Sequence, residues 1–65
     1  MIKRLKQRLK KADKLERSLG GNRMTLWVKM GISMDTWRKM FNHDHQPTRQ
    51  PTIDNINAYF DEVGI

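Results

Sequence analysis

The sequence contains no cysteine, only two prolines and few aromatic residues, which make up 8% of its 65 positions. The absence of cysteine excludes disulfide bonds and thiolate metal sites. No apolar run approaches the roughly 18 residues of a membrane-spanning helix, and charged residues follow the first two positions without the apolar stretch of a secretory signal. A chain of this length has room for one small domain. We therefore expect a single cytoplasmic domain over residues 1–65, with no membrane partner.

The sequence also lacks the features of an enzyme. It has no cysteine nucleophile, no glycine-rich phosphate loop and no paired carboxylates in an evident pocket. His43, Asp44 and His45 are adjacent, but two imidazoles in a loop without further ligands do not indicate a metal site. We expect no catalytic residues, no metal, no cofactor and no small-molecule ligand.

Positive charge is what the sequence has in excess, and it is concentrated in one segment. The formal net charge is +6. Residues 1–19 carry eight Lys or Arg and two acidic residues, whereas residues 20–65 carry five of each. Such a basic segment suits a polyanion, which means nucleic acid or an anionic membrane.

Apolar residues recur at spacings of three and four, which predicts an all-α fold of four to five helices. The first helix is expected over residues 2–19, before Gly20 and Gly21 end it. The basic residues of this helix have three open interpretations: they cover apolar surface, attract DNA without regard to sequence, or lie on lipid. The lipid interpretation leaves the second half of the chain without a role. The predicted buried stripe is Ile2, Leu5, Leu9, Ala12, Leu15 and Leu19.

Three further helices are predicted from capping residues. Asn22 begins a helix over residues 23–30 that Gly31 ends, and Ser33 begins one over residues 34–42. A polar loop over residues 43–50 follows, and Thr52 then caps a last helix over residues 52–63. The side chains expected to face inward are Leu26, Trp27, Met30, Trp37, Met40, Phe41, Ile53, Ile56, Tyr59, Phe60 and Val63.

Two helices joined by a three-residue turn that contains Gly31 suggest a helix-turn-helix. The closing segment opens with Pro51-Thr52-Ile53 and ends with Val63-Gly64-Ile65. On these residues the chain over 22–65 resembles lambda-repressor/Cro-like domains, the XRE family, although Trp27 stands where the family usually has alanine. The apolar residues that fit the motif are Leu26, Met30, Ile32, Trp37 and Met40.

The resemblance implies that the helix over residues 34–42 enters the major groove of double-stranded DNA. Its outer face would contact bases through Met34, Asp35, Arg38, Lys39 and Asn42. The alternative is a solvated face on which Asp35 pairs with Arg38 or Lys39. The implied phosphate contacts are Asn22, Arg23, Thr25, Lys29, Ser33, Thr36 and Arg49.

The resemblance further implies a sequence-specific transcriptional regulator, a Cro-like repressor of a phage, plasmid or bacterial promoter that acts by occupying its operator. It would bind a palindromic operator as a homodimer. Tyr59, Val63 and Ile65 are candidates for the dimer face and equally for the core. Two alternatives remain: a DNA-binding antitoxin, and an interaction module whose basic first helix binds an acidic protein or RNA.

Overall fold

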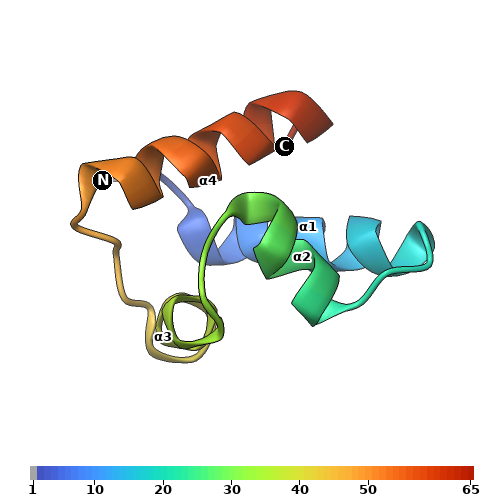
Figure 1. The fold of residues 1–65 in the computed structure, drawn as a ribbon, viewed down its shortest axis with the longest axis horizontal. Coiled ribbons are helices and arrows are strands. Elements are labelled where there is room, and N and C mark those ends of the chain that lie inside the picture. The colour runs from blue at the N-terminus through green and yellow to red at the C-terminus, as the bar shows by residue number, and fades with distance from the viewer. Residues whose placement is uncertain (1) are drawn as a thin grey trace.

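The computed structural model describes residues 2–65, and within this range the protein is all-helical. Its four helices are α1 (Leu5–Ser18), α2 (Arg23–Met30), α3 (Met34–His43) and α4 (Gln50–Val63). In Figure 1, α4 lies at the top, α1 and α2 lie in the middle, and α3 lies at the bottom, seen end-on. None of the helices in the described range is long and apolar enough to cross a membrane. The all-α prediction is confirmed.

The hydrophobic core draws on all four helices and on the residue that precedes them. Ile2 lies ahead of α1, and its backbone N–H donates to Gln46 Oε1 at 3.1 Å while its carbonyl accepts from Gln46 Nε2 at 3.2 Å. The start of the chain is thereby held against the loop that leads to α4. The buried apolar side chains are Ile2, Leu5, Leu9, Ala12, Leu26, Met30, Trp37, Met40, Ile56, Tyr59 and Phe60.

α1 is shorter than predicted, and its buried face differs at the C-terminal end. The helix begins only after Arg4, which adopts a left-handed conformation with φ 53°. Leu19 was predicted to be buried but is 68% exposed, because α1 ends at Ser18 and the chain turns there towards α2. Leu15, also predicted to be buried, is only half-buried. Glu16 takes the buried position instead, in line with Leu5, Leu9 and Ala12.

The turn between α2 and α3 follows the predicted caps. Asn22 Oδ1 accepts from the Thr25 backbone N–H at 3.0 Å, and Ser33 Oγ accepts from the Thr36 backbone N–H at 3.2 Å. Gly31 ends α2 with φ 71°, a conformation that favours glycine, and an added Cβ there would lie 3.2 Å from the side-chain amide of Asn55 in α4. The bounds of α2 match the prediction, and α3 extends one residue further than predicted, to His43.

α4 begins two residues earlier than predicted. Its N-cap is Arg49, which makes no side-chain capping bond, and Thr52, the predicted cap, lies inside the helix. Pro51 stands in the first turn, where its missing N–H costs no hydrogen bond, so the helix can start ahead of it. The predicted stripe is confirmed at Ile56, Tyr59 and Phe60, which are buried, while Ile53 and Val63 are half-buried.

One cation of α1 serves the fold itself. Arg8 Nη2 donates to the carbonyl oxygen of Ile65 at 2.8 Å, and the guanidinium carbon lies 4.4 Å from the centre of the Phe60 ring. Both partners belong to α4 or to the residues that follow it. The side of α1 that carries Arg8 is therefore turned towards α4.

Candidate functional site

The outer face of α3 carries the five side chains predicted to contact bases. Trp37 and Met40 are buried on the opposite side of the helix. Within residues 2–65, neither Arg38 nor Lys39 makes an ion pair, so the alternative pairing with Asp35 does not form. The donors of both cations therefore face solvent. The exposed side chains of this face are Met34, Asp35, Arg38, Lys39 and Asn42.

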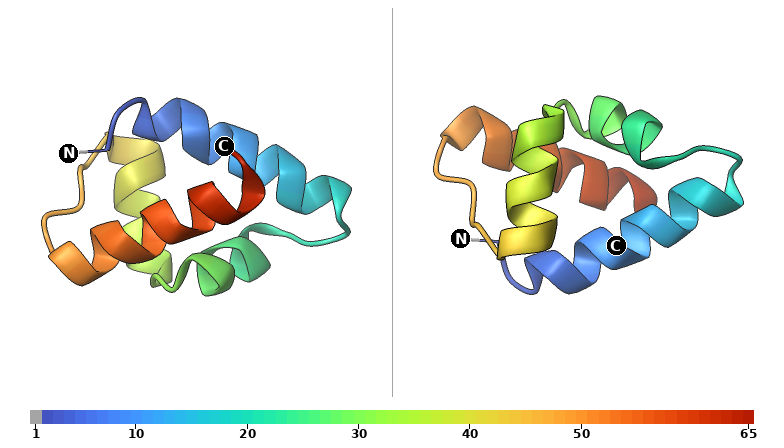
Figure 2. Two further views of the ribbon diagram at one scale, coloured as in Figure 1. Left: turned by 90° about the horizontal axis from the view of Figure 1, so that it is seen from above. Right: turned by 90° about the horizontal axis from the view of Figure 1, so that it is seen from below.

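α3 forms a ridge between two surface grooves, and Figure 2, in its right view, shows this helix along its length in front of α4. One groove follows the side of α3 that faces α2. The other groove lies between α3 and the loop that leads to α4. The first is lined by Arg23, Trp27, Met34, Trp37, Arg38 and Asn42, and the second by Thr36, Lys39, His45, Pro47, Thr48, Arg49 and Thr52.

The α2-side groove holds an arginine on an aromatic stack. The rings of Trp37 and Phe41 stack with centroids 5.3 Å apart, and the Arg23 guanidinium carbon lies 4.9 Å from the centre of the Phe41 ring. Arg23 Nε also lies 3.7 Å from Asp13 Oδ1 of α1. Trp27, predicted to face inward, is only half-buried because one side of it lines this groove. Arg23 is thus held in place by Phe41 of α3 and Asp13 of α1.

The loop-side groove brings together three of the predicted contact residues, Thr36, Lys39 and Arg49. It adds two hydroxyls that were not predicted as contacts, those of Thr48 and Thr52. Cations and hydroxyls are the side chains that most often bind phosphate oxygens. The position of Thr48 next to Arg49 in a polar loop is the signal that would have identified it, whereas Thr52 was interpreted as a helix cap.

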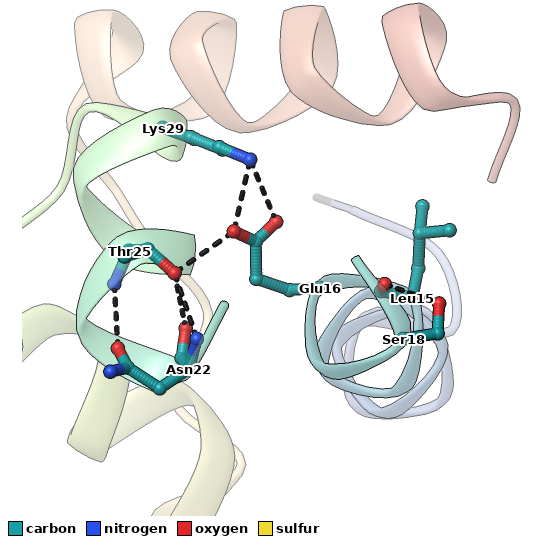
Figure 3. A network of polar contacts seen from close by, with 6 residues as sticks. All are labelled: Leu15, Glu16, Ser18, Asn22, Thr25 and Lys29. Atoms are coloured by element: carbon teal, nitrogen blue, oxygen red, sulfur yellow. Dashed lines mark hydrogen bonds and ion pairs between the residues drawn. The ribbon is translucent and has the colours of Figure 1, made fainter. Parts of the chain in front are cut away.

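Two of the predicted phosphate contacts, Thr25 and Lys29 of α2, are engaged with Glu16 of α1, as Figure 3 shows. Glu16 Oε1 accepts from the Thr25 hydroxyl at 2.9 Å and lies 2.9 Å from Lys29 Nζ, which also donates to Oε2 at 3.1 Å. Asn22 caps the same helix. An added Cβ at Gly21 would lie 2.6 Å from Thr25 Oγ1, so glycine leaves room for this network. The side chains of Thr25 and Lys29 are therefore occupied by Glu16 and are not counted among the candidate phosphate contacts.

The burial of Glu16 was not predicted from the sequence, because this position of the apolar stripe is occupied by a charged residue. The hydrogen bond from Lys29 holds the pKa of Glu16 below its ordinary value of 4.5, with Thr25 acting in the same direction and burial opposing both. The side chain of Glu16 is 3% exposed, whereas that of Lys29 is 53% exposed. Glu16 is therefore ionised at neutral pH, and it joins α1 to α2.

Replacing Lys29 by methionine is expected to destabilise the fold by about 1–3 kcal/mol at pH 7, because the buried carboxylate loses its charged hydrogen-bond donor. Urea unfolding followed by circular dichroism measures the change. The double variant Glu16→Gln, Lys29→Met removes the unpaired charge and should recover most of the loss. Equal stability of Lys29→Met and the unmodified protein would contradict this role of the pair.

The same pair gives stability a pH dependence of known sign. Because the folded-state pKa of Glu16 is lowered, its ionised form stabilises the fold above pH about 4.5. This stabilisation is lost as the pH falls through the folded-state pKa. In Lys29→Met the pKa of Glu16 rises, so this part of the acid sensitivity should disappear from the urea midpoints.

The candidates for a dimer face lie mostly inside the protein. Tyr59 is 5% exposed and belongs to the core, while Val63 and Ile65 are half-buried. The Tyr59 hydroxyl is buried and makes no hydrogen bond to the described residues. Burial raises the pKa of Tyr59, and the nearby charge of Glu16 adds to this.

Comparison with known proteins finds no matching family model and no significantly similar curated protein or solved structure. What the chain does must therefore be inferred from its own residues and their arrangement.

Proposed function

We propose that this protein binds double-stranded DNA with sequence specificity by placing α3 in the major groove. The observation that carries the proposal is the ridge formed by α3, which has an exposed polar face and an open groove along each side. A single α-helix fits the width of the major groove. With α3 in the major groove, the two sugar-phosphate backbones would run along the two sides of this helix, where the side chains that line the grooves lie.

The base contacts follow from the donors and acceptors on the face of α3. Arg38 and Lys39 donate to guanine O6 and N7, and Asn42 pairs with the N6 and N7 edge of adenine. Asp35 accepts from the cytosine amino group, and Met34 packs against a thymine methyl group. Arg38 lines the α2-side groove and Lys39 lines the loop-side groove, so the two cations reach towards opposite sides of the helix.

Phosphate contacts flank this reading face on both sides. Arg23 serves the α2 side, where the Phe41 ring and Asp13 hold its guanidinium. Arg49 serves the loop side with the hydroxyls of Thr36 and Thr48. Asn22 and Ser33 are the remaining phosphate contacts. They cap the N-termini of α2 and α3, and a helix N-terminus favours a phosphate.

The arrangement of α2, the three-residue turn and α3 supports a lambda-repressor-like helix-turn-helix, and with it a regulator that acts by occupying an operator. In such proteins a twofold dimer binds two half-sites about one helical turn apart. We therefore propose a homodimer on a palindromic site.

Selection of binding sites from random duplex DNA tests the proposal directly. We expect an enriched motif, repeated as an inverted pair whose centres are about 10 base pairs apart. Binding to duplex DNA without any enriched motif would contradict sequence-specific reading by α3. Enrichment of a single motif without its inverted copy would support sequence-specific binding but contradict the homodimer.

A further inference from the structure

We infer that one edge of α1 binds the phosphate backbone beside the groove that α3 enters, with Lys10 at the centre of that contact. The edge consists of Lys6, Lys10, Asp13 and Arg17, and we refer to it as the α1 edge. The inference rests on the proposed function, and it assigns a role to the basic segment of the chain that the reading face of α3 does not use.

Contacts at two points show which way the α1 edge is turned. Lys6 Nζ lies 3.6 Å from Asp44 Oδ1, and Asp44 is the residue that caps the C-terminus of α3. Asp13 Oδ1 lies 3.7 Å from Arg23 Nε at the start of α2. Lys10 follows Lys6 by four residues and precedes Asp13 by three. Because residues three and four apart share one side of a helix, Lys10 lies on the same side as Lys6 and Asp13. The α1 edge therefore faces α2 and α3.

The acidic residues of α1 leave the outward charge of this helix positive. Asp13 pairs with Arg17 at 3.2 Å as well as with Arg23, and Glu16 is buried against Lys29. Within residues 2–65, Lys10 makes no ion pair. Its side chain is exposed, so its ammonium group is free for a polyanion.

The length of the α1 edge suits a DNA backbone. Lys6 and Arg17 are separated by about 16 Å along the helix axis, at 1.5 Å per residue. One strand of B-DNA carries a phosphate about every 3.4 Å of its axis. The α1 edge therefore spans about five phosphates of one strand. The ion pair between Lys6 and Asp44 is exposed, so phosphate can replace the carboxylate there.

Lys11 provides a matched control next to Lys10. It follows Arg8 by three residues, and Arg8 reaches Phe60 and Ile65 on the α4 side of the molecule. Lys11 therefore lies on the opposite flank of α1, turned away from α3. Both lysines are exposed, and neither makes an ion pair within the described residues.

The test compares Lys10→Gln with Lys11→Gln on the selected duplex and on a random duplex over a range of salt concentrations. Losing one phosphate contact makes the slope of log affinity against log salt concentration shallower by about 0.9. The loss of affinity relative to the unmodified protein is therefore about 8-fold larger at 0.1 M salt than at 1 M. We expect this loss for Lys10→Gln by the same factor on both duplexes, and a change of less than about twofold for Lys11→Gln.

Three results would overturn the inference while leaving the proposed function intact. These are equal losses from the two substitutions, no loss from either, and a loss from Lys10→Gln on the selected duplex alone. If the unmodified protein binds no duplex, the inference and the proposed function both fail. Because both lysines are exposed, we expect each variant to keep its fold, and circular dichroism checks this.

Discussion

The double variant Arg38→Ala, Lys39→Ala is expected to lose its preference for the selected site over random duplex by about 30-fold or more. Each two-point contact from such a side chain to a guanine contributes about 1–3 kcal/mol of discrimination. Both residues are exposed and without an ion pair in the described residues, so the fold should be unaffected. The ratio of the two dissociation constants, measured at one salt concentration, gives the result.

A charge-matched control separates base reading from simple electrostatics. Lys3→Ala, Lys11→Ala removes two exposed cations from the basic segment and none from α3. It should leave the ratio of dissociation constants unchanged. If Arg38→Ala, Lys39→Ala has the same ratio of dissociation constants as the unmodified protein, α3 does not read the bases.

Trp37→Ala is expected to unfold most of the protein or leave it barely folded. Trp37 is 2% exposed, stacks on Phe41 and is among the largest fully buried side chains. Removal of a buried tryptophan costs about 3–5 kcal/mol. A domain of this size has a total stability of about 3–10 kcal/mol. Thermal and urea unfolding followed by circular dichroism measure the loss.

Trp27→Ala removes the same side chain from a half-buried position in the α2-side groove. The expected loss of stability is smaller, about 1–2 kcal/mol, because less apolar area is removed from the interior. Similar losses for the two tryptophan variants would mean that the α2-side groove is closed in solution.

The helices that depend on local signals could be predicted from the sequence. Asn22 and Ser33 cap α2 and α3 by hydrogen bonds to residues three positions away, and Gly31 ends α2 by its own backbone conformation. Such interactions act within one turn, so the residues alone specify them. The buried side of α3 followed for a similar reason, since Trp37 and Met40 leave only one side for the core.

The features that depend on distant segments could not be predicted. Glu16 is buried because Lys29 and Thr25 of α2 lie beside it, and no pattern within α1 indicates this. The loop-side groove likewise joins Thr36 to Thr48 and Thr52 only after the chain has turned back on itself. Arg8 and Lys10 belong to one basic stretch, yet packing against α4 gives the first a structural role and leaves the second exposed.

The sequence by itself determined that this chain is helical, that its positive charge lies in the first third, and that the polar side of residues 34–42 is free of core residues. Periodicity and composition are properties of neighbouring residues, so no fold is needed to find them. The tertiary structure alone decided which charges remain available. Pairing of Glu16 with Lys29 and of Asp13 with Arg23 requires two helices to meet. Only their packing leaves Lys10 and the outer face of α3 exposed while these acidic residues are paired.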